Sequence, residues 1–238
     1  MTIRCLSWDC YDQPINRLLT MAARFTHSVN NIPPEEITST PIAHQHHDVF
    51  SFLRAHLDAS APYMDSRIIT GEVVECVSLV VAHYSTYCML HPAESSLTTR
   101  NSQTWTPSTT EELGWKDYFY RITKYLLERM AYHLRIREIE CLEGVLLFER
   151  FVQRAQQHFA ITKESFAMTF TVSMILSNKL NADTPFSNRS WSEVFAINLA
   201  DLCDSECFFL QHVSDQLHMS GDDIREVMSV CEDAHTHE

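Results

Sequence analysis

A scarcity of glycine constrains the fold of this chain more than any other feature. Only 4 of its 238 residues are glycine, whereas about 7% is usual. Turns between strands, and the loops that bind phosphate in dinucleotide enzymes, need backbone with positive φ, which glycine supplies. A β-sandwich, a barrel or a Rossmann-type enzyme is therefore disfavoured, and the sequence predicts an all-α fold.

The charge distribution argues against nucleic acid as a partner. The chain has 18 basic and 31 acidic residues, a formal net charge of -13, and residues 115–218 carry 11 basic against 13 acidic residues. Phosphate backbones and anionic membranes are bound by clustered Lys and Arg. No segment has a surplus of these residues, so we expect neither nucleic acid nor a membrane as the main partner.

The amino terminus and the cysteines indicate an intracellular protein of the cytoplasm or nucleus. Asp9 and Asp12 interrupt the region where a signal peptide would need an apolar run. The eight cysteines include no CxxC pair, which is typical of reduced thiols. Cys203 and Cys207 share a helical face, but no further zinc ligands have suitable spacing. We expect no cofactor and no bound metal.

A Ser/Thr-rich stretch at 94–110 separates the chain into two regions. Seven of the eight prolines lie before residue 108. In this first region, apolar spacing predicts helices over 48–59 and 70–91. We therefore divide the chain into a helical amino-terminal extension with its linker (1–108), a helical bundle (109–218) and an acidic tail helix (219–238).

Five helices are predicted within 109–218. Thr109-x-x-Glu112 is a capping-box pattern that opens the first, whose apolar stripe runs to Met130. The second covers about 137–158 and the third 162–180. Ser190-x-x-Glu193 is expected to cap a short fourth helix, and Asn198 to open the fifth. The third helix is apolar nearly all round, which is typical of a helix at the centre of a bundle.

Three charged residues fall on apolar stripes. They are Glu149 on the second helix, Lys179 at the end of the third and Glu206 on the fifth. Burying a lone ion costs several kcal/mol, so each needs a partner or must reach water. Arg121 flanks the stripe of the first helix and is a candidate partner for Glu149. Lys179 and Glu206 have no evident internal partner except each other, which favours a largely apolar surface that binds another protein's backbone.

The bundle region resembles the cyclin box, and most closely the phosphate-pathway and P/U-type cyclins of fungi, plants and protists. The order of the helices carries this resemblance, together with short segments that span about 115–218. They are Trp115-Lys-Asp-Tyr-Phe-Tyr-Arg-Ile-Thr-Lys-Tyr125, Phe148-Glu-Arg-Phe151, Ile161-Thr-Lys-Glu-Ser-Phe166, Ser177-Asn-Lys179, Phe186-Ser-Asn188 and Asp201-Leu-Cys-Asp-Ser-Glu-Cys-Phe-Phe-Leu210.

The resemblance implies a regulatory subunit, without catalysis of its own, that binds and activates a cyclin-dependent kinase. In that family a lysine closing the third helix and a glutamate on the fifth contact the backbone of the kinase's mobile glutamate-bearing helix. These roles fall on Lys179 and Glu206, with Leu176, Leu180 and Leu210 as apolar neighbours. The family's buried Arg–Asp pair falls on Arg121 and Glu149.

The sequence departs from the family pattern in several places. The acidic residue of the buried pair is Glu149, one methylene longer than aspartate. An Asp-Asp expected after the third helix is Ala182-Asp183, and a Gly-Gly expected before Ile197 is Phe195-Ala196. The substrate-recruiting motif of many animal cyclins is absent around 120–122. These departures indicate a divergent member, for example one from a protist.

Two other functions compete with this interpretation. His44-Gln-His-His47-Asp48, with His56, His83 and His91, has the residue types by which all-α HD-type phosphohydrolases hold metal ions. Transcription factors and pocket proteins also use cyclin-like boxes, but those that bind DNA have basic faces.

Four short motifs are candidate modification sites. Thr40-Pro41, Thr106-Pro107 and Thr184-Pro185 are minimal sites for proline-directed kinases, and Thr106, in the linker, is expected to be the most reachable. Asn188-Arg-Ser190 fits a glycosylation sequon, which we interpret as coincidental in an intracellular protein.

Overall fold

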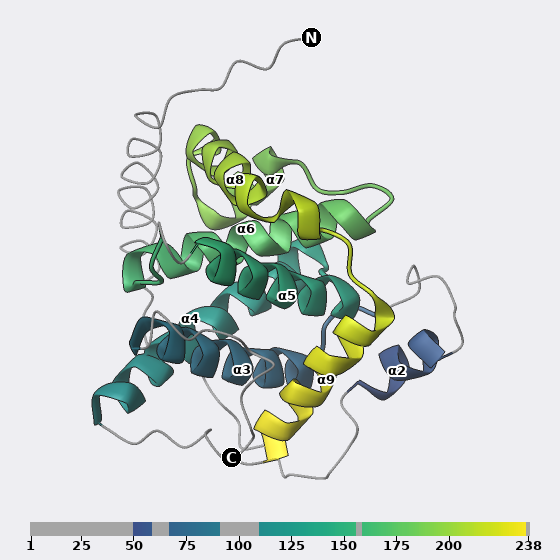
Figure 1. Ribbon diagram of the computed structural model, residues 1–238. Coiled ribbons are helices and arrows are strands. Elements are labelled where there is room, and N and C mark those ends of the chain that lie inside the picture. Colours follow the sequence, from purple (N-terminus) through teal and green to yellow (C-terminus); the bar gives the residue numbers. More distant parts are fainter. Residues whose placement is uncertain (1–49, 59–66, 91–109, 156–158, 237–238) are drawn as a thin grey trace.

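The all-α prediction is confirmed. The computed structural model describes residues 50–58, 67–90, 110–155 and 159–236, and over these ranges the chain forms eight α-helices and one short 3-10 helix (Figure 1). The elements are α2 (Ser51–Asp58), α3 (Gly71–Leu90), α4 (Thr110–Leu134), α5 (Glu138–Ala155), α6 (Lys163–Asn181), α7 (Asn188–Phe195), α8 (Leu199–Val213), η5 (Ser214–Gln216) and α9 (Gly221–Thr236).

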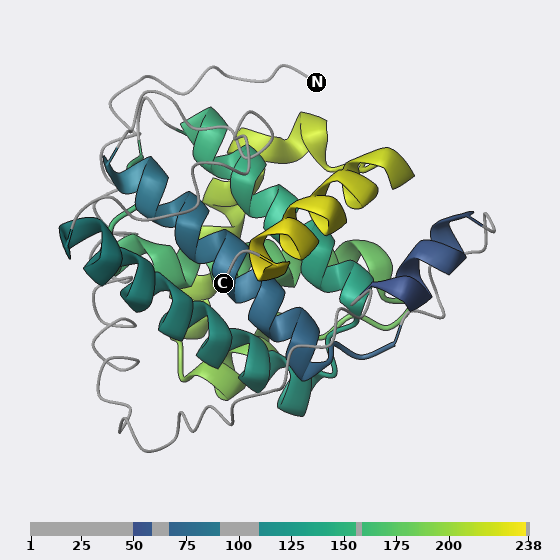
Figure 2. The same ribbon diagram turned by 90° about the horizontal axis from the view of Figure 1, so that it is seen from below.

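The helices are stacked in three layers. In Figure 1, α7 and α8 lie at the top, α5 and α6 in the middle, and α3 and α4 below. Figure 2 shows α3 and α4 side by side, with α9 crossing α3 on the outside. Helix α5 contacts α3, α6, α8 and α9, so it is enclosed on several sides. This enclosure explains why its acidic residues, and not only its apolar stripe, are buried.

Helix α6 has the central position that its composition predicts. Every residue from Ser165 to Asn178 is buried. Its close approach to α5 depends on small side chains: a Cβ added at Gly144 would come within 2.4 Å of the Met174 sulfur. Ser177 fits the same interface and donates a hydrogen bond of 2.7 Å to the Glu140 carbonyl. Small residues therefore set the distance between the two middle helices.

Side chains cap the starts of α6, α7 and α8, and the cap of α7 differs from the predicted one. Thr162 and Ser165 form a capping box at the start of α6, and Asn198 caps α8 as predicted. The expectation that Ser190 caps the fourth helix is wrong. Ser187 caps α7 by accepting from the Ser190 backbone N–H, and the helix begins at Asn188. Burial of Trp191 depends on this earlier start, because it places the indole one turn inside the helix.

The amino-terminal extension contributes to the same hydrophobic core as the bundle. One cluster of buried apolar residues runs from Phe50 to Ala234. Helix α3 packs along α4, and α9 packs against α3 and α5. By length and composition α3 is the one described helix that could cross a membrane, but 78% of that stretch is buried inside the protein, as in the core helix of a folded domain.

Candidate protein-docking surface

Lys179 and Glu206 meet at one rim of the bundle. Lys179 lies in the last turn of α6, and its Nζ is 2.5 Å from Oε1 of Glu206, in the middle of α8. The lysine side chain is 32% exposed and the glutamate side chain 12% exposed. Each charge is therefore the partner of the other, which is the internal pairing that the sequence left open, and neither requires a second polypeptide.

Asn188 completes the group from α7. Its Nδ2 donates to Oε2 of Glu206 at 2.6 Å and lies 3.4 Å from the sulfur of Cys203. The Glu206 carboxylate thus accepts one bond at each oxygen, from two different helices. With its amide engaged in these contacts, Asn188 is a poor glycosylation acceptor, which agrees with the coincidental reading of the sequon.

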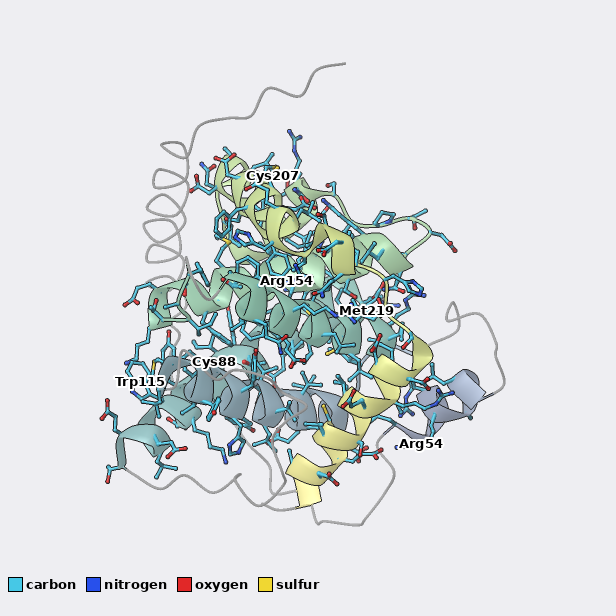
Figure 3. All side chains as sticks on the ribbon, viewed as in Figure 1. Arg54, Cys88, Trp115, Arg154, Cys207 and Met219 are labelled. Carbon is cyan, nitrogen blue, oxygen red and sulfur yellow. The ribbon has the colours of Figure 1, made fainter. Side chains whose placement is uncertain are left out.

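The apolar residues predicted for this surface differ in accessibility. Leu176 is buried at 4% exposure and belongs to the core. Leu210 is half-buried and packs against the core from α8. Leu180 follows Lys179 directly, lies at the end of α6 and is 49% exposed. Cys207, next to Glu206, lies on the outer face of α8 at the top of Figure 3.

A buried polar network, absent from the sequence-based expectations, holds the adjoining loop. Glu140, 2% exposed, accepts from the Arg137 backbone N–H at 2.7 Å and guanidinium at 3.0 Å, and from Asn178 Nδ2 at 3.1 Å. Asn178, 3% exposed, also accepts from the Phe186 backbone N–H at 3.1 Å. The start of α5, the end of α6 and the loop that leads to Asn188 are therefore one connected unit.

Two arginines fix the helices on either side of this surface. Arg129 of α4 donates to the Val194 carbonyl at 2.5 Å and so binds the end of α7. Arg150 of α5 donates to the carbonyls of Gln216 at 2.5 Å and His218 at 3.0 Å, at the linker after α8. In Figure 3, the labels of Arg154 on α5 and Met219 after η5 mark this part of the molecule. These contacts join the end of α7 to α4 and the segment after α8 to α5.

Burial changes the acid–base properties of two carboxyl groups on α5. Desolvation raises the pKa of Glu143, and the hydrogen bond from Asn181 opposes this shift. Desolvation likewise raises the pKa of Glu138, against the attraction of Arg67. Both groups lie on the α5 segment that joins the polar network.

The predicted pair between Arg121 and Glu149 is not formed. Arg121 is 51% exposed and pairs with Asp117, four residues earlier on α4, at 2.8 Å. Glu149 is buried at 4% exposure and accepts from Gln153 Nε2 at 2.8 Å. Tyr84 of α3 donates to the Glu149 backbone carbonyl at 3.5 Å, and α3 packs against α5. An exposed pair such as Arg121–Asp117 contributes only about 0.3–0.5 kcal/mol.

The histidine-rich motif of the competing interpretation lies outside the described residues, as do His91 and the side chain of His56. His83 is described, and it is buried on α3. Within the described ranges, no group of three or more His, Cys, Asp or Glu side chains is arranged to hold a metal ion. Four of the described cysteines are buried in the core, namely Cys76, Cys88, Cys141 and Cys231. Burial raises the thiol pKa of Cys76, Cys141 and Cys231.

Comparison with known proteins does not identify a family. No family model matches the chain, and no curated protein matches it.

Proposed function

We propose that this protein is a cyclin-like regulatory subunit that binds and activates an intracellular cyclin-dependent kinase through the rim formed by α6, α7 and α8. The proposal is supported by the resemblance of 115–218 to the cyclin box. It is also supported by the order of helices from α4 to α8, in which only α7 is short and α6 is buried all round.

The observation that carries the proposal is the exposed Leu180 beside a charge pair. A leucine that is 49% exposed lies next to Lys179, with half-buried Leu210 on the neighbouring helix. Buried apolar anchors surrounded by polar groups are typical of protein interfaces. Lysine has three N–H donors, of which Glu206 takes one, and each carboxylate oxygen can accept a second bond. The pair can therefore still bind backbone carbonyls and amides of a partner helix.

Activation would follow from differential binding. A docked surface shifts the kinase toward its active conformation only if it binds that conformation more tightly than the inactive one. The bonds from Arg129 to the end of α7 and from Arg150 to the segment after α8 hold these helices to the bundle, which favours such selectivity.

A binding experiment with matched leucine variants tests the proposal. The full chain is titrated against purified cyclin-dependent kinases, and kinase activity is measured in the same mixtures. Leu180→Glu should abolish association, whereas Leu113→Glu should not. Leu113 is 55% exposed and lies two residues before Trp115. The Trp115 ring contacts Lys163 at the start of α6. Leu180 lies at the opposite end of α6, which is about 28 Å long.

The charged pair gives a second comparison. Lys179→Ala and Glu206→Ala should each weaken association by no more than about 0.5–1.5 kcal/mol, because both side chains are already bonded in the free chain. Unchanged kinase affinity in Leu180→Glu, or no association with any such kinase, would refute the proposal. Near-stoichiometric zinc, iron or manganese in the purified protein would favour the phosphohydrolase instead.

A further inference from the structure

The loop between α6 and α7 presents a threonine followed by proline at its tip. Both ends of the loop are fastened to Asn178: the Ala182 N–H donates to its carbonyl at 2.9 Å, and the Phe186 N–H to its side chain at 3.1 Å. Asp183, Thr184 and Pro185 form the tip between these two anchors, and all three are exposed. Figure 1 shows this segment arching outward beyond α6.

We propose that Thr184 is a phosphorylation site for a proline-directed serine/threonine kinase, and that the phosphate controls the rim that carries Lys179. The other two Thr-Pro pairs, at 40 and 106, lie outside the described residues. Thr184 is the one whose surroundings are described, and it is exposed on a fixed loop outside any helix. A kinase can therefore reach its hydroxyl without unfolding a helix.

The chemistry transfers one phosphoryl group from ATP. The Thr184 Oγ1 attacks the γ-phosphorus, the bond from that phosphorus to the β–γ bridging oxygen breaks, and ADP leaves. The hydroxyl proton passes to the catalytic base of the kinase. The product carries about -1.5 to -2 charges and strong acceptor oxygens at the loop tip.

Cations near the loop would bind this phosphate. Arg189, in the first turn of α7 and five residues from Thr184, is exposed and makes no hydrogen bond or ion pair with any residue that the structure describes. Lys179 lies five residues before Thr184 and is bound to the singly charged Glu206 carboxylate. Arg137 donates to the carbonyl of Asn181, the last residue of α6 before the loop, at 3.0 Å.

A phosphate on Thr184 would add a second anion close in sequence to Lys179, which already binds Glu206. Phosphate oxygens and ammonium groups form strong charge-assisted hydrogen bonds, so the phosphate would compete for this lysine if it reaches it. Asp183, next to Thr184 in the chain, repels the new charge, whereas Arg189 attracts it. Phosphorylation therefore rearranges the charges of the rim. On the proposed function, it weakens docking of the kinase; this second step rests on that function, whereas the modification itself does not.

Mass spectrometry of the folded full chain tests the site. The Thr40→Ala/Thr106→Ala background is incubated with a proline-directed kinase and Mg-ATP, and phosphopeptides are mapped. We expect one phosphate at Thr184. It should be lost in Thr184→Ala and strongly reduced in Pro185→Ala, which keeps the hydroxyl and removes the directing residue. Phosphorylation of a peptide covering 180–188 but not of the folded chain would overturn the assignment, because the fixed loop would then be inaccessible.

Titration of the phosphorylated and unmodified chains with the kinase that the unmodified chain binds tests the second step. Docking should weaken by about tenfold or more, which corresponds to 1.4 kcal/mol. Equal affinities would overturn control of the rim and leave the proposed function intact. If the unmodified chain binds no cyclin-dependent kinase, the proposed function fails, and the modification site is still decided by the phosphopeptide map.

Discussion

Asn178→Ala is the substitution that most directly tests how the candidate surface is held. Asn178 is 3% exposed and connects two elements through one side chain. Its Nδ2 donates to the Glu140 carboxylate at 3.1 Å, and its Oδ1 accepts from the Phe186 N–H at 3.1 Å. Alanine removes both bonds, but Glu140 keeps its two bonds from Arg137.

The expected cost follows from the two lost bonds. A hydrogen bond to a charged group contributes about 1.5–3 kcal/mol, and a buried N–H left without a partner costs about 1–3 kcal/mol. Phe186 is only half-buried, so water can reach its N–H and reduce the second contribution. The variant should therefore lose about 2–5 kcal/mol of unfolding free energy, which lowers Tm by about 4–20 °C in a chain of this size.

Urea denaturation, monitored by tryptophan fluorescence, measures this loss. An unchanged m value would indicate that the variant and the parent expose the same surface on unfolding. Gln211→Ala is a matched control, because it removes an exposed amide from α8 and should stay within about 0.5 kcal/mol of the parent. Native-state hydrogen exchange should show faster exchange at the Phe186 amide. A loss in Asn178→Ala no larger than that of the control would refute the network.

Two further substitutions test other features of the fold. Ala196 ends α7 in the left-handed conformation (φ 53), so Ala196→Gly should raise the unfolding free energy by about 1 kcal/mol in a thermal melt. The control Ala200→Gly, in the first turn of α8, should lower the unfolding free energy. Equal effects of the two substitutions would contradict backbone strain at Ala196. Burial raises the pKa of Glu143 above its ordinary 4.5. Its contribution to stability is thus complete below about pH 4.5 and lost as the pH rises through the raised pKa. Glu143→Gln stays neutral, so its stability relative to the parent should increase from about pH 4 to about pH 7 in urea titrations, and a constant difference would show that Glu143 has an ordinary pKa.

Helix positions could be predicted from the sequence because they depend on local patterns. The apolar stripe of 115–130 matches the buried residues of α4, and Asn198 caps α8 as its residue type favours. Ser190 and Ser187 illustrate the limit of such patterns. Both serines fit an N-cap, and their local sequence does not choose between them. In the structure Ser187 is the cap, and it follows Phe186, whose N–H donates to Asn178 of α6.

The site could be predicted only in part. The stripe positions correctly marked Lys179, Glu206 and Glu149 as charges near apolar surroundings, because helical periodicity fixes which face a residue shares. Periodicity does not specify which helix covers that face. Arg121 is a candidate partner for Glu149 because it flanks the apolar stripe of its helix, but it binds Asp117 on α4, and Tyr84 of α3 contacts the backbone at Glu149. The polar network was missed because Glu140 and Asn178 look like ordinary solvated residues in their local sequence.

The internal pair changes what kinase docking must accomplish energetically. If Lys179 and Glu206 were unpaired in the free chain, docking would gain the full energy of satisfying two ions. Because they are bonded to each other and to Asn188, a partner backbone can only add to, or exchange with, bonds that already exist, and the net gain of an exchange is small. Most of the binding energy must then come from apolar surface, of which Leu180 is the exposed member. The pair would mainly set the orientation of the docked helix and reject partners that leave Lys179 and Glu206 desolvated without compensation.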